Sequence, residues 1–256
     1  MDLEKAQNTI IDFIRNEVKK AGLGGAVVGI SGGIDSALTA TLTVKALGEE
    51  NVLGIHMPES GLTSAADTKD AKILSNWLGI KFLTIDISGI IQAFMTTIPD
   101  SEFFDRISKG NMKARTRMSI LYLYANHLNR MVMGTGNKTE LLLGYYTKYG
   151  DGGVDTEPIG GLYKTEVWEL SRKLGIPDSI INKKPTAGLW TGQTDEAELG
   201  MPYTTVDKVL KMLEINTDSQ SILESAKISE GQLNSIRKRI EQSEHKRKSP
   251  PSPKLA

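Results

Sequence analysis

The sequence predicts an α/β fold, in which a parallel sheet carries helices on both faces and a helical part follows at the C-terminal end. Short β-branched or apolar runs at residues 26–30, 52–57, 82–87 and 130–134 alternate with helical patterns in the first half of the chain. This alternation favours a parallel sheet, because parallel neighbours need long, usually helical, crossover connections. A glycine-rich turn, GISGGIDS, covers residues 29–36 at the end of the first run, where such sheets bind ligands.

Apolar spacing predicts the individual helices. Ala6, Ile10, Ile14 and Val18 share one face of an amphipathic N-terminal helix. Two further buried stripes are predicted, at Ala66, Ile73, Leu74, Trp77 and Leu78 and at Met118, Leu121, Tyr122, Ala125 and Leu128. The pattern over 165–174 predicts another helix, and capping residues predict helix starts at Ser64, Thr204 and Ser229.

Two long stretches lack periodicity, residues 137–161 and 183–202. Loops of this length in a compact domain are either functional or disordered, so both are candidate substrate loops and the second is a candidate lid. We expect a single domain over 1–248 and a disordered, proline-rich tail over 249–256.

Composition excludes several classes of protein. The 256 residues include 31 basic and 31 acidic side chains, which argues against a large nucleic-acid footprint. No apolar run is long enough for a membrane helix, and the N-terminus does not resemble a signal peptide, so a cytoplasmic location is expected. The sequence contains no cysteine, which excludes a persulfide-carrying sulfur transferase and a cysteine-dependent glutaminase within this chain.

The turn SGGIDS at residues 31–36 has the chemistry of an anion site. Adjacent glycines let backbone N–H groups converge on one anion, and the following helix start adds positive potential. A Walker A motif is excluded, because no lysine occurs between Gly22 and Thr43. The carboxylate of Asp35 suits a phosphate site only if a hard cation such as Mg²⁺ bridges the two. The alternative is a plain glycine turn in which Asp35 caps the helix.

This turn resembles the pyrophosphate loop, S-G-G-x-D-S, of the N-type ATP pyrophosphatases, which cleave ATP between its α and β phosphates. That group includes several synthetases and tRNA-modifying enzymes, and the loop alone does not choose among them. Four further segments resemble the NAD synthetase family, in the family's order: GNMKARTRM at 110–118, the stretch 134–170, PTAGLW at 185–190 and EHKR at 244–247. The resemblance implies a Rossmann-like ATP pyrophosphatase fold and the ATP-dependent amidation of deamido-NAD to NAD.

The resemblance also implies roles for single residues. Asp35 and Glu140 would bind Mg²⁺, and Asp35 and Lys164 would act in catalysis. The implied ATP-binding residues are Gly29, Ile30, Ser31, Gly32, Gly33, Ile34, Asp35, Ser36, Thr135, Lys164 and Thr186. Without the resemblance, the two threonines would be read as helix caps and Lys164 as a solvated lysine.

The implied deamido-NAD-binding residues are Arg115, Lys148, Asp155, His245 and Lys246. Arginine can bind a phosphate through two hydrogen bonds, whereas lysine acts as a point charge. Asp155 would instead meet a ribose hydroxyl or the nicotinate end. The last two residues would otherwise be read as a frayed, basic helix end.

The missing cysteine implies that free ammonia is the nitrogen source, unless a separate subunit supplies it. The family resemblance further implies a homodimer with substrate near the interface. Two alternatives remain at this point: another ATP pyrophosphatase, such as a tRNA-modifying enzyme, and a nucleotide sensor that does not turn over its ligand.

Overall fold

The computed structural model describes residues 1–190 and 192–253. Within them, four parallel strands form one sheet in the order β3-β2-β1-β4. The strands are β1 (Ala26–Gly29), β2 (Val52–His56), β3 (Lys81–Thr84) and β4 (Met131–Met133). Each strand overlaps one of the predicted runs, so the predicted parallel sheet is confirmed.

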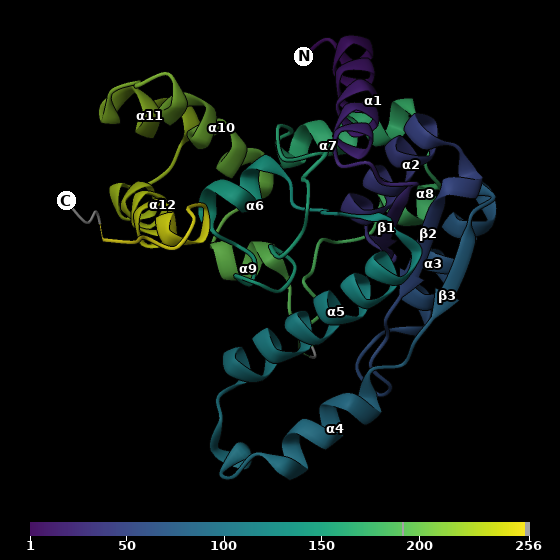
Figure 1. Ribbon diagram of the computed structural model, residues 1–256. Coiled ribbons are helices and arrows are strands. Elements are labelled where there is room, and N and C mark those ends of the chain that lie inside the picture. Colours follow the sequence, from purple (N-terminus) through teal and green to yellow (C-terminus); the bar gives the residue numbers. More distant parts are fainter. Residues whose placement is uncertain (191, 254–256) are drawn as a thin grey trace.

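Helices connect and cover the strands (Figure 1). They are α1 (Leu3–Lys20), α2 (Ile34–Leu47), α3 (Ala65–Leu78), α4 (Ser88–Thr97), α5 (Arg106–Leu128), α6 (Lys138–Leu143), α7 (Lys164–Lys173), α8 (Asp178–Ile181), α9 (Asp195–Leu199), α10 (Tyr203–Glu214), α11 (Ser219–Ala226) and α12 (Glu230–Gln242). Among the described residues, none of these helices is both long and apolar enough to cross a membrane.

Successive side chains of the strands pack into two separate apolar cores, one on each face of the sheet. Val28 packs with apolar residues of α1, α2 and α7 on one face, while Val27 packs with residues of α4 and α5 on the other. The split follows from the pleat, which points successive side chains of a strand to opposite faces. Helices therefore cover both faces of the sheet, as predicted.

The C-terminal helices α10, α11 and α12 gather beside α6, to one side of the sheet (Figure 1). They enclose a third apolar cluster, and Trp168 of α7 contacts both this cluster and the core on the α2 face. This shared contact supports a single domain over 1–248, which remains a prediction. Residues 249–253 are exposed and lack helix or strand, and the rest of the expected tail, 254–256, lies outside the described residues.

Several local predictions need correction. Helices α6 and α9 lie inside the stretches 137–161 and 183–202, which were expected to lack regular structure. On α3, Leu74 and Leu78 are buried as predicted and Ala71 is buried beside them, whereas Ala66 and Trp77 are exposed. On α5, the predicted stripe residue Leu128 is exposed as well. Helix α10 begins after Pro202 rather than with Thr204 as its cap. The caps Ser64 and Ser229 are confirmed.

The order of the strands fixes where a ligand can bind. From β1 the chain passes to β2 and then to β3 on one side of β1. It then crosses back and places β4 on the other side of β1, so the direction of the connections reverses between β1 and β4. Such switch points open a crevice beyond the carboxyl ends of the strands. The turn after β1 and the segment after β4 therefore meet there.

Candidate active site

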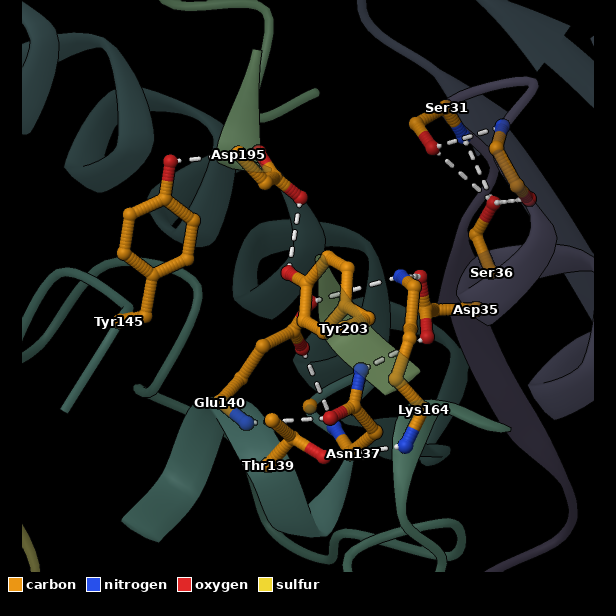
Figure 2. Close-up of polar contacts among 12 residues, drawn as sticks. Ser31, Asp35, Ser36, Asn137, Thr139, Glu140, Tyr145, Lys164, Asp195 and Tyr203 are labelled. Carbon is orange, nitrogen blue, oxygen red and sulfur yellow. Dashed lines mark hydrogen bonds and ion pairs between the residues drawn. The ribbon is translucent and has the colours of Figure 1, made fainter. Parts of the chain in front are cut away.

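The turn between β1 and α2 is held in shape by its own serines (Figure 2). Ser31 Oγ accepts a hydrogen bond from the Gly33 N–H at 3.1 Å, and Ser36 Oγ accepts one from the Ser31 N–H at 3.2 Å. Gly32 has a φ of 87°, and a Cβ there would overlap the Asp67 carbonyl oxygen, so only glycine fits. The turn is thus a compact cradle at the start of α2, in which the serine hydroxyls and the Ser31 and Gly33 N–H groups bond to one another. That this cradle binds an anion remains a prediction.

The flanking residues of the turn serve the fold as well. The Ile30 N–H donates to the Ile55 carbonyl at 2.9 Å, and the side chains of Ile30 and Ile34 are buried in the core. Gly29 ends β1. These residues can meet a ligand only through their backbone.

Asp35, in the first turn of α2, lies at the centre of a polar cluster (Figure 2). It forms an ion pair with Lys164, the first residue of α7, and accepts a hydrogen bond from Asn137 Nδ2 at 2.9 Å. Glu140 Oε1 lies 3.7 Å from the Lys164 ammonium nitrogen. One lysine thus faces two carboxylates, and these residues come from three segments that are far apart in the sequence.

Helix α6 positions the Asn137–Glu140 side of this cluster through a capping box. The Asn137 side chain accepts from the Glu140 N–H at 3.0 Å, and the Glu140 carboxylate accepts from the Asn137 N–H at 3.2 Å. Between them, Thr139 Oγ1 accepts from the Lys164 N–H at 3.0 Å and donates to Asp207 at 2.5 Å. Local capping chemistry therefore joins α6 to the start of α7.

The electrostatics of the cluster depend on burial. Lys164 is 1% exposed. Burial alone would lower its pKa, but the nearby charges of Asp35 and Glu140 raise the pKa above its ordinary value. Burial raises the pKa of Glu140, and the neighbouring Asp35 raises it further. The two carboxylates repel each other, and without a ligand the lysine compensates them.

This donor set fits a hard cation in part. The structure brings together two carboxylates, which are oxygen ligands of the kind that Mg²⁺ prefers, while the Asn137 amide points its nitrogen at Asp35 and its oxygen at the Glu140 N–H. No group of three or more histidine, aspartate or glutamate side chains in the described part of the chain is arranged to hold a metal alone. Magnesium usually completes its coordination with waters and substrate phosphates, so a pair of protein carboxylates is compatible with such a site.

The segment 183–202 folds back on itself and on the cluster. Thr186 Oγ1 donates to the Gln193 carbonyl at 2.8 Å, so its hydroxyl is engaged inside the segment. Asp195 is 3% exposed and accepts hydrogen bonds from Tyr145 at 3.2 Å and Tyr203 at 2.9 Å. Burial raises the pKa of Asp195, whereas the charge of Lys164 lowers it. Asp195 therefore belongs to the edge of the cluster, although no motif of the sequence singles it out.

Four of the five predicted dinucleotide residues lie in one neighbourhood. Arg115 donates to the Lys148 carbonyl at 3.2 Å, and Lys148 Nζ donates to the His245 carbonyl at 2.7 Å. Lys246 Nζ donates to the carbonyls of Gly144 and Tyr146, each at 2.6 Å. These cations are held by backbone carbonyls rather than by carboxylates.

Asp155 lies apart from these contacts. It accepts a hydrogen bond from Tyr122 Oη at 2.9 Å and another from the Val132 N–H at 2.8 Å. Its carboxylate thus ties the segment after α6 to β4 and α5.

The residues that follow β4 contact a carboxylate from a later segment, that of Glu157, which no sequence pattern selected. Glu157 accepts from the Gly136 N–H at 3.0 Å, and a Cβ on Gly134 would overlap its carboxylate. Burial raises the pKa of Glu157 to about 8. It lies next to Thr135, whose predicted ATP contact stays a prediction. The sequence feature that could have indicated Glu157 is its place beside two glycines in DTEPIGG, residues 155–161.

The chain matches the NAD synthase family over residues 6–250. It is 72% identical over 255 residues to the NH(3)-dependent NAD(+) synthetase of Methanosarcina acetivorans, with 100% of both chains covered. The chain belongs to the NAD synthase family.

Solved structures agree with this NAD synthase assignment. The NH3-dependent NAD synthetase from Campylobacter jejuni, in complex with the nitrate ion, is 35% identical with a TM-score of 0.83, covering 99% of this chain and 100% of that one. The NMN synthetase from Francisella tularensis is 34% identical with a TM-score of 0.88, covering 100% of both chains. The predicted family and the Rossmann-like α/β fold are therefore confirmed, whereas the roles of single residues remain predictions.

Proposed function

We propose that this protein converts deamido-NAD to NAD with ammonia, using ATP and releasing AMP and pyrophosphate. The observation that carries the proposal is the pairing of the buried Lys164 with two partly buried carboxylates, Asp35 and Glu140, beside the cradle 31–36. The similarity to relatives named NH3-dependent NAD synthetases supports the choice of reaction.

The geometry suits activation of a carboxylate. A carboxylate resists attack by an amine because oxide would have to leave, whereas its mixed anhydride with AMP has a good leaving group. The N–H and hydroxyl groups of the turn 31–36 would exchange their present hydrogen bonds within the turn for the pyrophosphate that departs when AMP is transferred. Lys164, Thr135 and Thr186 would contact ATP; for a contact through its hydroxyl, Thr186 would have to release the Gln193 carbonyl.

Asp35 and Glu140 would hold Mg²⁺, which would supply positive charge to the phosphates. Without a ligand Lys164 bridges the same two carboxylates. Its ammonium is thereby kept where a phosphate oxygen would approach, so no large movement is needed to make a charge-assisted hydrogen bond.

The second substrate would bind where Arg115, Lys148, His245 and Lys246 meet. The side-chain N–H groups of these cations, which now donate to backbone carbonyl oxygens, can donate to the pyrophosphate oxygens of the dinucleotide instead. Asp155 is exposed, and its oxygens can accept a further hydrogen bond from a ribose hydroxyl. A mononucleotide acid is the second candidate substrate, because the NMN synthetase structure matches the whole chain.

Free ammonia would be the nitrogen source, since the sequence lacks the cysteine that a cysteine-dependent glutaminase requires. We further propose a homodimer and a cytoplasmic location. Support for the homodimer comes from α4 and the first turns of α5, which project from the sheet in Figure 1. Apolar side chains on α4, α5 and their connection are exposed: Phe94, Ile98, Phe103, Phe104, Ile107 and Leu123. Exposed apolar side chains that form a contiguous patch often mark an interface.

Product analysis tests the proposed function. The protein is incubated with ATP, Mg²⁺ and deamido-NAD, with ammonium or glutamine as nitrogen source, and with nicotinate mononucleotide in parallel. We expect AMP, pyrophosphate and NAD with ammonium alone. Intact ATP under all conditions would favour a nucleotide sensor, and AMP without NAD would favour another ATP pyrophosphatase. Faster turnover of the mononucleotide would favour the second candidate.

A further inference from the structure

Lys183, outside the residues assigned above, lies behind the anion cradle. Its Nζ donates to the Gly32 carbonyl at 2.9 Å and to Asp67 Oδ1 at 2.8 Å, and it forms an ion pair with Asp70 Oδ2 at 2.6 Å. Lys183 also follows α8 directly, at the start of the segment 183–202.

The contact of Lys183 with the Gly32 carbonyl fixes the direction in which the Gly33 N–H points. The peptide between Gly32 and Gly33 is trans, so its carbonyl oxygen and its N–H point in opposite directions. Because Lys183 holds the carbonyl, the Gly33 N–H is directed to the other side of the peptide, where it meets Ser31 Oγ. That side is the anion cradle.

The contacts of Lys183 with Asp67 and Asp70 compensate negative charge. Asp67 belongs to the first turn of α3, and its backbone carbonyl lies against Gly32. Burial would raise the pKa of Asp67, but the hydrogen bonds from Lys183 and Ser64 lower it overall, so the carboxylate stays ionised. Asp70 is bonded to Lys183 at 2.6 Å and accepts from Ser179 Oγ at 2.8 Å. Without Lys183, two carboxylates would stand uncompensated behind a site that must attract phosphate.

We propose that Lys183 is a positioning residue for the pyrophosphate of ATP, which orients the Gly32–Gly33 peptide and neutralises Asp67 and Asp70 behind it. This inference rests on the proposed function, because it assumes that the cradle binds pyrophosphate. Lys183 does not touch the ligand itself.

Equilibrium binding of Mg²⁺-pyrophosphate, Mg²⁺-ATP and deamido-NAD, measured by calorimetry, tests the inference. Lys183→Met should weaken pyrophosphate and ATP binding about tenfold, the range expected for losing a hydrogen bond to a charged group. Deamido-NAD binding should stay unchanged. The matched control, Lys184→Met, removes an exposed lysine next to it and should bind all three ligands like the wild type.

Two further variants separate positioning from a general structural role. Lys183→Arg keeps the charge and should retain most of the pyrophosphate affinity. Adding Asp67→Asn to Lys183→Met should restore part of the lost affinity, because it removes a repulsive charge. No difference between the single and the double variant would overturn the neutralising role.

The outcomes distinguish this inference from the proposed function. If the wild-type protein binds neither pyrophosphate nor ATP, the proposed function fails. If the wild type binds both and Lys183→Met binds them equally well, or loses deamido-NAD to the same degree, only the role of Lys183 is overturned.

Discussion

The two ends of the candidate site hold their charged side chains in different ways. At the ATP end, the buried Lys164 pairs with the partly buried carboxylates of Asp35 and Glu140. At the dinucleotide end, Arg115 and Lys148 donate to backbone carbonyls near the surface. Burial demands charge compensation, whereas solvated cations need none. The ATP end is therefore preorganised by its own charges, and the dinucleotide end keeps its cations available for a ligand.

The largest expected effect comes from Asp35→Asn, which removes one charge from the ATP end at nearly constant shape. The rate of AMP formation should fall by about 100-fold or more, as for the loss of a principal electrostatic group. The fold should persist, because Glu140 still compensates Lys164. Steady-state kinetics and circular dichroism measure the two effects, and an unchanged rate at saturating Mg²⁺ would remove Asp35 from the mechanism.

Lys164→Met tests whether lysine and metal compete for the same carboxylates. Without the ammonium, Asp35 and Glu140 repel each other, so Mg²⁺ alone should bind the ligand-free variant about tenfold more tightly than the wild type. Metal-dependent shifts of the melting temperature report this affinity. Lys211→Met, which removes a lysine paired with Glu166 outside the cluster, is the control and should leave the shift unchanged. Equal shifts in Lys164→Met and the wild type would contradict the proposed metal site.

Lys148→Ala should affect only the dinucleotide end. We expect the KM for deamido-NAD to rise about tenfold, the usual size for a lost charge-assisted hydrogen bond, while the KM for ATP stays constant. Initial rates with each substrate varied in turn provide both values. Equal increases in both KM values would show that the two ends are not independent.

The smallest effect concerns the pH dependence of stability through Glu157. Its pKa is raised to about 8, so the folded protein binds a proton that the unfolded chain releases at lower pH. The stabilisation is complete below the ordinary pKa of a glutamate and is lost as the pH rises towards 8. Glu157→Gln keeps a neutral side chain at every pH. The free energy of unfolding of this variant minus that of the wild type should therefore rise by at least about 1 kcal/mol from pH 5 to pH 9.

Urea unfolding at both pH values measures this gain. Glu169→Gln, at an exposed position on α7, is the control and should show no such trend. A constant difference between Glu157→Gln and the wild type would mean that the carboxyl of Glu157 ionises normally.

The same contrast explains what could be predicted from the sequence. The strands and the cradle were predictable, because apolar runs and the turn SGGIDS are local patterns. Asn137 was missed, since its contact with Asp35 spans 102 positions of the chain. Helix α6 escaped detection because its capping box sits in a stretch rich in glycine and tyrosine.

Other polar residues of the site were missed for the same reason. Asp195, Glu157 and Lys183 gain their significance from burial and from partners on other elements. No local pattern in the sequence distinguishes these three residues from the other charged residues. The dinucleotide residues were selected only through the family resemblance, because exposed cations carry no pattern of their own.

The most direct measurement of the central claim is a rapid-quench experiment with enzyme, ATP, Mg²⁺ and deamido-NAD in the absence of ammonium. If the nicotinate carboxylate is adenylated before nitrogen attack, pyrophosphate should form in a burst up to the concentration of enzyme sites. Ammonium added afterwards should convert the held intermediate to NAD and AMP. If pyrophosphate instead forms only when ammonium is present, a preformed adenylate, and with it the proposed division of the site, is contradicted.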